Sequence, residues 1–381
     1  MHISRCTTQQ NTTKLRVDTY TGFDSLPQGY TYLFEESCCK SFFYSMPWFK
    51  NLAAAVLGND DVVRIYGVVM DNVAQTPVAA LVMQYKNVSS GRVRSYQLSG
   101  LSNYYSSLFG PIVGNAPYST SDIIQPLVSA ICSDTPVWHV IDCNPLDIES
   151  PCYAALVDAL QNCGMIVQTY FCFGNWYLQV NGRSYKEYLE TLPSTMKNTL
   201  KRKSKKWENQ AGARLEIITG GNDLAAAIEA YERVYSVSWK VPEPYPLFIR
   251  GLIHTCAAAG WLRLGLAYVE DEPVAAQLWI VNEGTASIYK LAYDERWAHL
   301  SIGSILTAQL MKHVIEVDKV REVDYLTGDD SYKQTWMSHR RERWGIRAFN
   351  PWTVKGLFRA MRHRGGHAVK TMWQCLRRTQ Q

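Results

Sequence analysis

Residues 261–293 read WLRLGLAYVEDEPVAAQLWIVNEGTASIYKLAY and contain three strand-like runs with almost no linker between them. The runs lie at 261–270, 273–282 and 285–293 and are rich in β-branched, aromatic and small apolar residues. The acidic turn 270–272 joins the first two runs, and the Asn-Glu-Gly turn 282–284 joins the last two. Turns of this kind are typical of hairpins, so the stretch predicts an antiparallel three-stranded meander.

The sequence on both sides of the meander predicts one mixed unit of helices and strands. Apolar residues recur at spacings of three and four over 223–239, which indicates a helix, and a Pro-rich segment leads into a second helix that ends at Gly260. A strand at 214–219 precedes both helices. After the meander we expect a helix over 301–317, a strand at 322–326, a short helix and a last strand near 345–350.

The first half of the chain alternates in the same way. Helices are predicted near 48–57, 123–132 and 151–162, and strands at 62–70, 78–85, 137–142 and 165–173. The 381 residues are 47% hydrophobic and 19% charged, which fits a well-packed globular protein and excludes disordered or collagen-like material. The fold class is therefore predicted to be α/β (α+β), with mixed, mostly antiparallel sheets flanked by helices.

The composition also restricts the cellular compartment in which we expect the protein and the cofactors that we expect it to bind. No apolar run approaches the roughly 20 residues that cross a bilayer, and the polar N-terminus lacks the apolar core of a secretory signal, so we expect a cytoplasmic protein. The ten cysteines include no Cys-x-x-Cys pair, and most lie in apolar segments. Neither a disulfide framework nor a metal site is predicted.

Three stretches carry a family resemblance. They are DYLTGDDSYKQTW at 324–336, LPSTMKNTLKRK at 192–203 and FYSMPW at 43–48. Together with the order of elements over 185–350, they resemble the GNAT-like acyltransferases of the cellulose-biosynthesis CelD/BcsL type, which are relatives of the FemAB peptidoglycan aminoacyltransferases. The resemblance implies two tandem GNAT-like units: a degenerate unit at 1–180 and an acyltransferase unit at 181–350. A basic amphipathic tail at 351–381 follows.

The resemblance also implies acetyl-CoA or another acyl-CoA as co-substrate. In GNAT enzymes it lies between the fourth and fifth strands, with its pyrophosphate at the start of the next helix, where unpaired N–H groups and the helix dipole favour an anion. The usual Arg/Gln-x-x-Gly-x-Gly/Ala pattern is reduced here to Gly303, so an ordinary serine-capped helix start is an equally good interpretation. The predicted cofactor-binding residues are Leu291, Ala292, Tyr293, Leu300, Ser301, Ile302, Gly303 and Ser304.

The catalytic candidates follow the fifth strand. The resemblance implies that Tyr332 protonates the departing thiolate, while packing in the core beside Trp336 is the alternative. Asp329 and Asp324 flank Gly328 and are candidates for the base or for binding an amine, although Asp residues beside a glycine also commonly build turns.

Three residues are predicted on the acceptor side: Trp239, His254 and Lys333. Lys333 is expected to pair with a neighbouring aspartate or with a phosphate. A lone helical histidine is more often a packed or surface residue than a base. No Ser-His-Asp order, HExxH motif or Walker loop occurs, so the sequence does not support a hydrolase, zinc protease or nucleotidase.

Positive charge gathers in two segments. Residues 1–180 hold 9 basic and 13 acidic residues, whereas 181–381 hold 30 and 21. Residues 197–206 carry six basic residues and no acid. This cluster suits the phosphates of CoA, an anionic polysaccharide or lipid head group, or tRNA, and a solvated helix face is the alternative. The tail suits either an anionic membrane surface, at the inner face of the membrane, or an extra packed helix.

Three functions remain open from the sequence. The first is an acyl-CoA-dependent N- or O-acyltransferase that acts directly on an amine or hydroxyl of a saccharide, lipid-linked or small-metabolite acceptor. The second is a FemAB-like transferase that uses aminoacyl-tRNA. The third is a non-catalytic binding protein on the same fold, because fold does not fix function.

Overall fold

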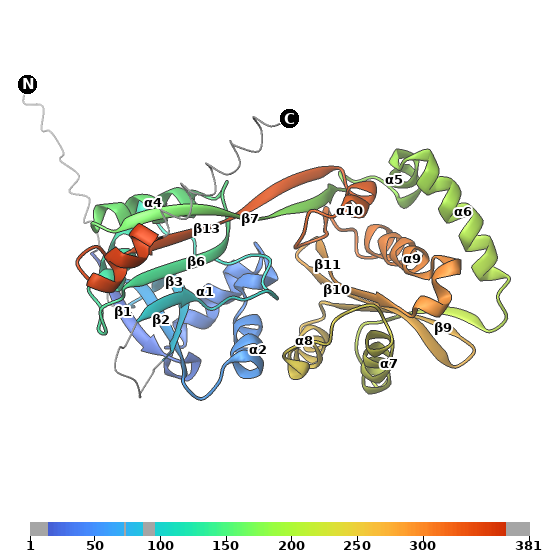
Figure 1. Cartoon of the computed structure of the whole chain (residues 1–381), viewed down its shortest axis with the longest axis horizontal. Helices are drawn as coiled ribbons and strands as arrows, with labels where there is room; N and C mark the ends of the chain where they lie inside the picture. Colours follow the sequence, from blue (N-terminus) through green and yellow to red (C-terminus); the bar gives the residue numbers. More distant parts are fainter. Residues whose placement is uncertain (1–13, 72–73, 87–95, 363–381) are drawn as a thin grey trace, which may run out of the picture.

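The computed structural model describes residues 14–71, 74–86 and 96–362 and shows two units with the same order of elements (Figure 1). Each unit runs strand, two helices, three strands, helix, strand, helix, strand. The first unit comprises β1 (Leu15–Thr21), α1 (Gly29–Cys38), α2 (Met46–Val56), β2 (Asp61–Met70), β3 (Pro77–Lys86), β4 (Gln97–Gly100), α3 (Thr120–Cys132), β6 (Val140–Asp147), α4 (Pro151–Asn162) and β7 (Ile166–Gln179). The second comprises β8 (Ala213–Ile218), α7 (Leu224–Ser236), α8 (Pro246–Ala258), β9 (Leu262–Val269), β10 (Glu272–Asn282), β11 (Thr285–Tyr293), α9 (Ile302–Glu316), β12 (Glu322–Asp324), α10 (Ser331–Trp336) and β13 (His339–Phe349). This repeat confirms the predicted α/β class and its two tandem units.

Several further elements lie outside this repeat. The helices α5 (Tyr185–Thr191) and α6 (Ser194–Glu208) connect the two units. The short strand β5 (Ile112–Val113) pairs with β3, and the 3₁₀ helices are η1 (Phe23–Ser25), η2 (Phe42–Tyr44) and η3 (Glu295–Leu300). In Figure 1, α7 and α8 lie on one face of the second unit's strands and α9 lies on the opposite face.

The two units exchange their last strands. β6 pairs with β13 from the second unit, so that Arg343 lies opposite Asp147. β12 pairs in turn with the end of β7 from the first unit, where Asp324 lies opposite Tyr177. β7 and β13 also pair with each other along their length, and Figure 1 shows this two-stranded ribbon running from one unit to the other. As a result the strands of both units form one continuous sheet.

Both exchanged strands are longer than the sequence predicts. The expected strands were 165–173 and 345–350, whereas the structure extends them to Ile166–Gln179 and His339–Phe349. The added residues are those that reach from one unit to the other. Gly345 is required near the middle of the ribbon, because a side chain there would clash with the ring of Tyr170. Each predicted unit therefore contributes a strand to the other unit's part of the sheet.

The meander is confirmed as the antiparallel strands β9, β10 and β11. Glu270 and Glu283 have left-handed φ angles of 53° and 46° in the two tight turns, and Gly284 follows with a φ of 79°. The predicted helix 301–317 is α9. A register shift between β10 and β11 leaves Tyr289 as an extra residue in β11, a bulge that alters the direction of the strand at this point.

An aromatic cluster fills the contact between the units. Trp48 of α2 is 1% exposed and packs edge-on against Phe248 of α8, with ring centroids 5.7 Å apart, and against Tyr289, at 6.2 Å. Asn51 on the same helix donates a hydrogen bond of 3.2 Å to the carbonyl oxygen of Phe248. Edge-to-face rings with this burial contribute beyond their apolar area, so the cluster joins the two units firmly.

We expect Trp48→Ala to lower the free energy of unfolding by about 3–5 kcal/mol, because it removes a large buried side chain and leaves a cavity between the units. Urea unfolding followed by circular dichroism measures this change. Trp352→Ala is the matched control, because Trp352 is 83% exposed, and its effect should stay within about 0.5 kcal/mol. Equal effects of the two substitutions would contradict the proposed packing.

Candidate functional site

The candidate site begins where β11 and β12 separate. The two strands pair in parallel over only three positions, ending with Ser287 opposite Asp324. Beyond that point β11 continues to Tyr293 while the chain after β12 turns away. The gap opens into a cavity of about 230 Å³, the strand-split cleft. It is lined by Tyr104, Tyr105, Ser107, Lys240, Ile288, Tyr289, Lys290, Leu291, Tyr325, Leu326, Thr327, Asp330, Tyr332 and Lys333.

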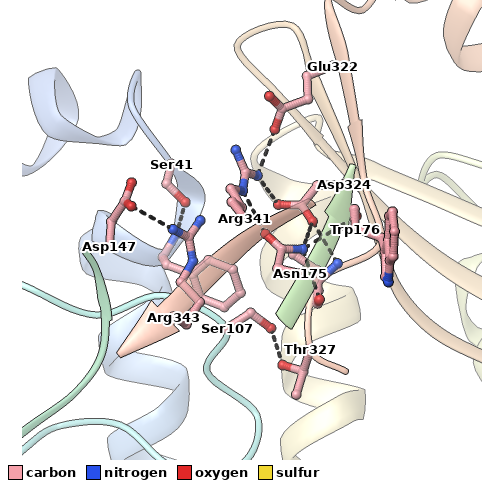
Figure 2. Close-up of polar contacts among 12 residues, drawn as sticks. Ser41, Ser107, Asp147, Asn175, Trp176, Glu322, Asp324, Thr327, Arg341 and Arg343 are labelled. Carbon is pink, nitrogen blue, oxygen red and sulfur yellow. Dashed lines mark hydrogen bonds and ion pairs between the residues drawn. The ribbon is translucent and has the colours of Figure 1, made fainter. Parts of the chain in front are cut away.

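One wall of the cleft comes from the first unit. The hydroxyls of Ser107 and Thr327 share a hydrogen bond of 2.6 Å, which joins a first-unit loop to the turn after β12 (Figure 2). Tyr105 stacks on Phe248, with ring centroids 3.9 Å apart, and its carbonyl oxygen accepts a hydrogen bond of 2.9 Å from Tyr289. Both units therefore build the cleft.

The carboxylate of Glu243 anchors the loop between α7 and α8 at the edge of the cleft. It accepts hydrogen bonds from the hydroxyls of Tyr104 (2.9 Å), Tyr105 (2.7 Å) and Tyr235 (2.6 Å), and from Lys290 Nζ (2.6 Å). Burial alone would raise the pKa of Glu243, but these donors hold it below its ordinary value. With so many donors engaged, Glu243 fixes the loop in place and is poorly suited to accept a proton.

Sequence reasoning missed Glu243, Lys290 and the contributions of Tyr104, Tyr105 and Ser107. The available signals were the Pro-rich loop around Glu243 and the Gly/Ser/Tyr-rich character of 99–114. Neither signal identifies a partner, because the contacts join segments more than 130 residues apart in the chain.

Two predicted residues, Tyr332 and Lys333, line the cleft side by side. Tyr332 is 47% exposed and packs edge-on against Tyr325 at 5.6 Å; burial, together with the nearby Asp330 carboxylate, raises its pKa to about 12. The hydroxyl is therefore protonated at neutral pH. Lys333 is buried, donates to the carbonyl oxygen of Thr327, lies 3.4 Å from Asp330 Oδ2, and has its pKa lowered by burial.

The other two predicted catalytic residues lie outside the lining of this cleft. The buried Asp324 accepts hydrogen bonds from Asn175 Nδ2 (2.5 Å), from the backbone N–H of Leu326 (2.7 Å) and from Arg341 Nη2 (2.6 Å), as Figure 2 shows in part. These bonds fix the turn after β12. Asp329 is paired with Arg340 at 2.8 Å, and this arginine holds the pKa of its carboxyl below the ordinary value.

The predicted cofactor residues lie at the end of β11 and the start of α9. Leu291 lines the cleft, and Ala292 is buried opposite Ala276 of β10. Leu300 and Ile302 are buried and hold the start of α9 in the core. Ser301 has a left-handed φ of 56° and precedes α9 without a side-chain capping bond, and its carbonyl oxygen accepts from the N–H of Ser304 at 3.0 Å.

Two neighbouring side chains affect the binding of an anion at the start of α9. The ring of Tyr293 lies over Gly303, so that a Cβ atom on Gly303 would sit 3.1 Å from Tyr293 Cδ1. Lys203, from the basic helix α6, donates a hydrogen bond to the carbonyl oxygen of His299 in η3. A cation of α6 therefore lies close to the positive end of the α9 dipole, and an anion bound there would interact favourably with both.

The remaining acceptor-side candidates lie apart from each other. Trp239 follows α7 and packs against Tyr293, with ring centroids 4.5 Å apart, next to the predicted cofactor residues. His254 is an exposed residue of α8 and lines none of the cavities described here. Within the described residues, no group of His, Cys, Asp and Glu has the arrangement of a metal site.

A comparison with known protein families finds a match over the part of the second unit that lines the cleft. Residues 194–334 match the family model of an acetyltransferase (GNAT) domain. The match runs from the basic helix α6 through the meander and the split strands to the Tyr-Lys pair of α10. This part of the chain is similar to a GNAT domain.

Solved structures resemble the chain over most of its length. FemX has a TM-score of 0.59 at 9% identity, covering 82% of this chain and 95% of FemX. A conserved protein of unknown function from Bacteroides thetaiotaomicron VPI-5482 has a TM-score of 0.50 at 10% identity, covering 83% of this chain and 92% of that one. A tandem GNAT protein from the clavulanic acid biosynthesis pathway has a TM-score of 0.49 at 10% identity, covering 87% and 98%. No curated protein matches the sequence.

At these identities a structural likeness shows the fold alone. The chain has a GNAT acyltransferase fold with two tandem GNAT-like units, the second of which carries the family match. The finer resemblance to the CelD/BcsL type remains a prediction.

We expect Arg341→Met to lower the free energy of unfolding by about 3–5 kcal/mol, because it leaves Asp324 and Glu322 without their shared cation. Arg340→Met removes a more exposed pair and should cost about 0–1 kcal/mol.

Burial already raises the pKa of Glu322, and losing Arg341 raises it further, so the folded variant binds protons more readily than the unfolded chain. The loss in free energy of unfolding caused by Arg341→Met should therefore become smaller as pH falls from 7.5 toward 4.5. Urea titrations at several pH values measure this loss. A loss that becomes larger on acidification contradicts the expectation.

Proposed function

We propose that the chain is an acyltransferase that moves an acyl group, such as acetyl, from acyl-CoA to an amine or hydroxyl of an acceptor. The observation that carries the proposal is the separation of β11 from β12 beyond Ser287, which opens a cleft lined by Tyr332 and Lys333. The acceptor is proposed to be a saccharide, a lipid-linked group or a small metabolite, in polysaccharide or envelope synthesis of the CelD/BcsL kind.

In this proposal the thioester lies along β11. β12 pairs with β11 only as far as Ser287, and a backbone N–H within the stretch Leu291–Tyr293 binds the oxygen of the thioester carbonyl as it gains negative charge. The pyrophosphate lies at the start of α9, over Ser301, Gly303 and Ser304, where the helix dipole and Lys203 provide positive potential.

The reaction is a direct transfer. The acceptor nitrogen or oxygen bonds to the acyl carbon, the carbon–sulfur bond breaks, and the sulfur takes the proton of the Tyr332 hydroxyl. The proton lost by the acceptor reaches solvent, and solvent restores the Tyr332 proton. Lys333 and Trp239 bind the acceptor, with Lys240 and Lys290 adding positive charge to the same cleft. Asp324 and Asp329 support this site through the turn after β12 and the pair with Arg340, and His254 has no role in this scheme.

A second candidate is transfer from aminoacyl-tRNA, as in the FemAB relatives. It is favoured by α6, where Lys201, Arg202, Lys205 and Lys206 are exposed on one helix. Such a cluster suits a phosphate backbone, and binding through it would weaken steeply with salt as counterions are released. A non-catalytic binding role is the third candidate.

The basic tail at 351–381 is relevant to where in the cell the protein acts. In its described part, Trp352, Val354, Phe358 and Met361 are exposed beside Lys355, Arg359 and Arg362, while Ala360 packs against Val140 and Phe349. Exposed apolar and basic side chains together suit an anionic membrane surface, and we propose a cytoplasmic enzyme that binds the inner face of the membrane peripherally. Residues 363–381 of the predicted tail lie outside the described part. None of the described helices is long and apolar enough to cross a bilayer.

We expect Gly303→Trp to abolish acetyl-CoA binding, because the indole would occupy the helix start already covered by Tyr293. Isothermal titration calorimetry should give micromolar binding for the wild-type protein and for the control Gly58→Trp, which alters an exposed loop. If wild type binds no acyl-CoA, while aminoacyl-tRNA binds and dissociates steeply with salt, the second candidate replaces the first.

We expect Tyr332→Phe to lower kcat by about 10²–10⁴-fold, as for loss of a general acid, with acetyl-CoA affinity unchanged. Release of free CoA thiol in a screen of amine and hydroxyl acceptors measures the rate. Tyr32→Phe is the control and should leave kcat unchanged, because Tyr32 is 67% exposed on α1 and does not line the cleft. An unchanged kcat for Tyr332→Phe would remove this residue from the chemistry.

A further inference from the structure

A second cavity lies between the two units, beside the strand-split cleft. It has a volume of about 220 Å³, and the two cavities share Ser107 and Leu326 as wall residues. The first unit contributes Lys40, Ser41 and Asp147 to this seam cavity, and the ribbon strand β13 contributes Arg341 and Arg343. Its walls are polar on most sides, whereas the aromatic cluster elsewhere between the units is apolar.

Arg341, on one wall, is fully engaged within the protein. Its Nε donates to Asn175 Oδ1 at 2.7 Å, and its Nη2 lies 2.8 Å from Glu322 Oε1 and 2.6 Å from Asp324 Oδ2 (Figure 2). One guanidinium thus serves two carboxylates and an amide. Because Arg341 has these partners within the protein, no ligand is needed to account for its position in the wall.

Arg343, two residues further along the same strand, differs sharply from Arg341. Its side chain is 5% exposed, and its only carboxylate partner in the described part of the chain is Asp147, with Nη1 and Oδ1 3.0 Å apart. That ion pair does not have hydrogen-bond geometry: within the described residues, Nε and Nη1 of Arg343 have no hydrogen-bond partner. Figure 2 shows the Arg343 guanidinium next to Asp147 and apart from the Arg341–Asp324 pair.

A buried guanidinium whose donors meet no protein acceptor lacks the hydrogen bonds that usually offset its burial. The planar fork of arginine matches the oxygens of a carboxylate or phosphoryl group, which can accept two parallel hydrogen bonds. The charges allow such a group here: Glu322 and Asp324 pair with Arg341, and among the described residues Asp147 is the one carboxylate paired with Arg343. Lys40, whose Nζ bonds to the carbonyl oxygen of Val113, adds positive charge to the wall.

We propose that the seam cavity binds a small ligand through a carboxylate or phosphoryl group, anchored by the guanidinium of Arg343. The hydroxyls of Ser41 and Ser107 supply further donors from the first unit. The site is distinct from the start of α9, where the CoA phosphates are proposed to bind, and its existence does not depend on acyl transfer in the cleft.

The test is isothermal titration calorimetry of the full chain with inorganic phosphate and, separately, with acetate, against sodium chloride at the same ionic strength. Wild-type protein should bind at least one of the two anions saturably, and the anion that binds identifies a phosphoryl or a carboxylate ligand. Arg343→Gln should weaken that binding at least tenfold. Arg16→Gln, at the far strand β1, is the matched control and should bind like wild type.

Asp147→Asn provides a test of opposite sign. Removing the one carboxylate beside Arg343 should tighten anion binding several-fold, an outcome that loss of folding cannot imitate. The proposal is overturned if wild type binds neither anion, if Arg343→Gln binds as well as wild type, or if Asp147→Asn binds more weakly. It is also overturned if Gly303→Trp, and not Arg343→Gln, abolishes phosphate binding.

Stability without ligand gives an independent readout. Arg343→Met should leave the unfolding midpoint in anion-free buffer unchanged or raised, because it removes donors that have no partner. A large fall in the midpoint would mean that Arg343 supports the fold in the way Arg341 does, and would contradict a ligand role.

Discussion

The pairing of β7 with β13 is the constraint on which the rest of the structure depends. Each strand begins in one unit and ends in the other, so β6 and β12 both complete their hydrogen bonding with a strand from the opposite half of the chain. A sheet edge left without that partner would expose its backbone groups. The exchange therefore holds the units in one relative position, and the first-unit loop around Ser107 reaches the cleft of the second unit only because of it.

Much of the fold was predictable because its signals are local. The turns at Glu270 and Glu283 and the apolar periodicity of α9 could be read from neighbouring residues, whereas the two tandem units were expected from the family resemblance. The strand exchange could not, since alternation shows that a strand exists but does not identify its partner. Gly174 and Asn175 interrupt the apolar pattern of β7 at the point where it leaves the first unit, so the sequence predicted a strand that was too short.

The site was predictable to a similar extent. Tyr332 and Lys333 follow a recognisable motif and line the cleft, whereas Tyr105, Ser107 and Glu243 reach the site through contacts between distant segments. Arg341 and Arg343 look equivalent in sequence, two basic residues on one strand. The two residues differ in their hydrogen-bond partners. The Arg341 guanidinium bonds to two carboxylates and an amide, whereas Arg343 is buried and its Nε and Nη1 have no hydrogen-bond partner among the described residues.

The exchanged strands make the two units one structural body with a jointly built site. Differential scanning calorimetry of the full chain is the test of this statement. We expect a single unfolding transition whose calorimetric and van't Hoff enthalpies agree, since neither unit keeps its sheet without the other. Two separate transitions, or a calorimetric enthalpy well above the van't Hoff value, would show that the units unfold independently and would contradict it.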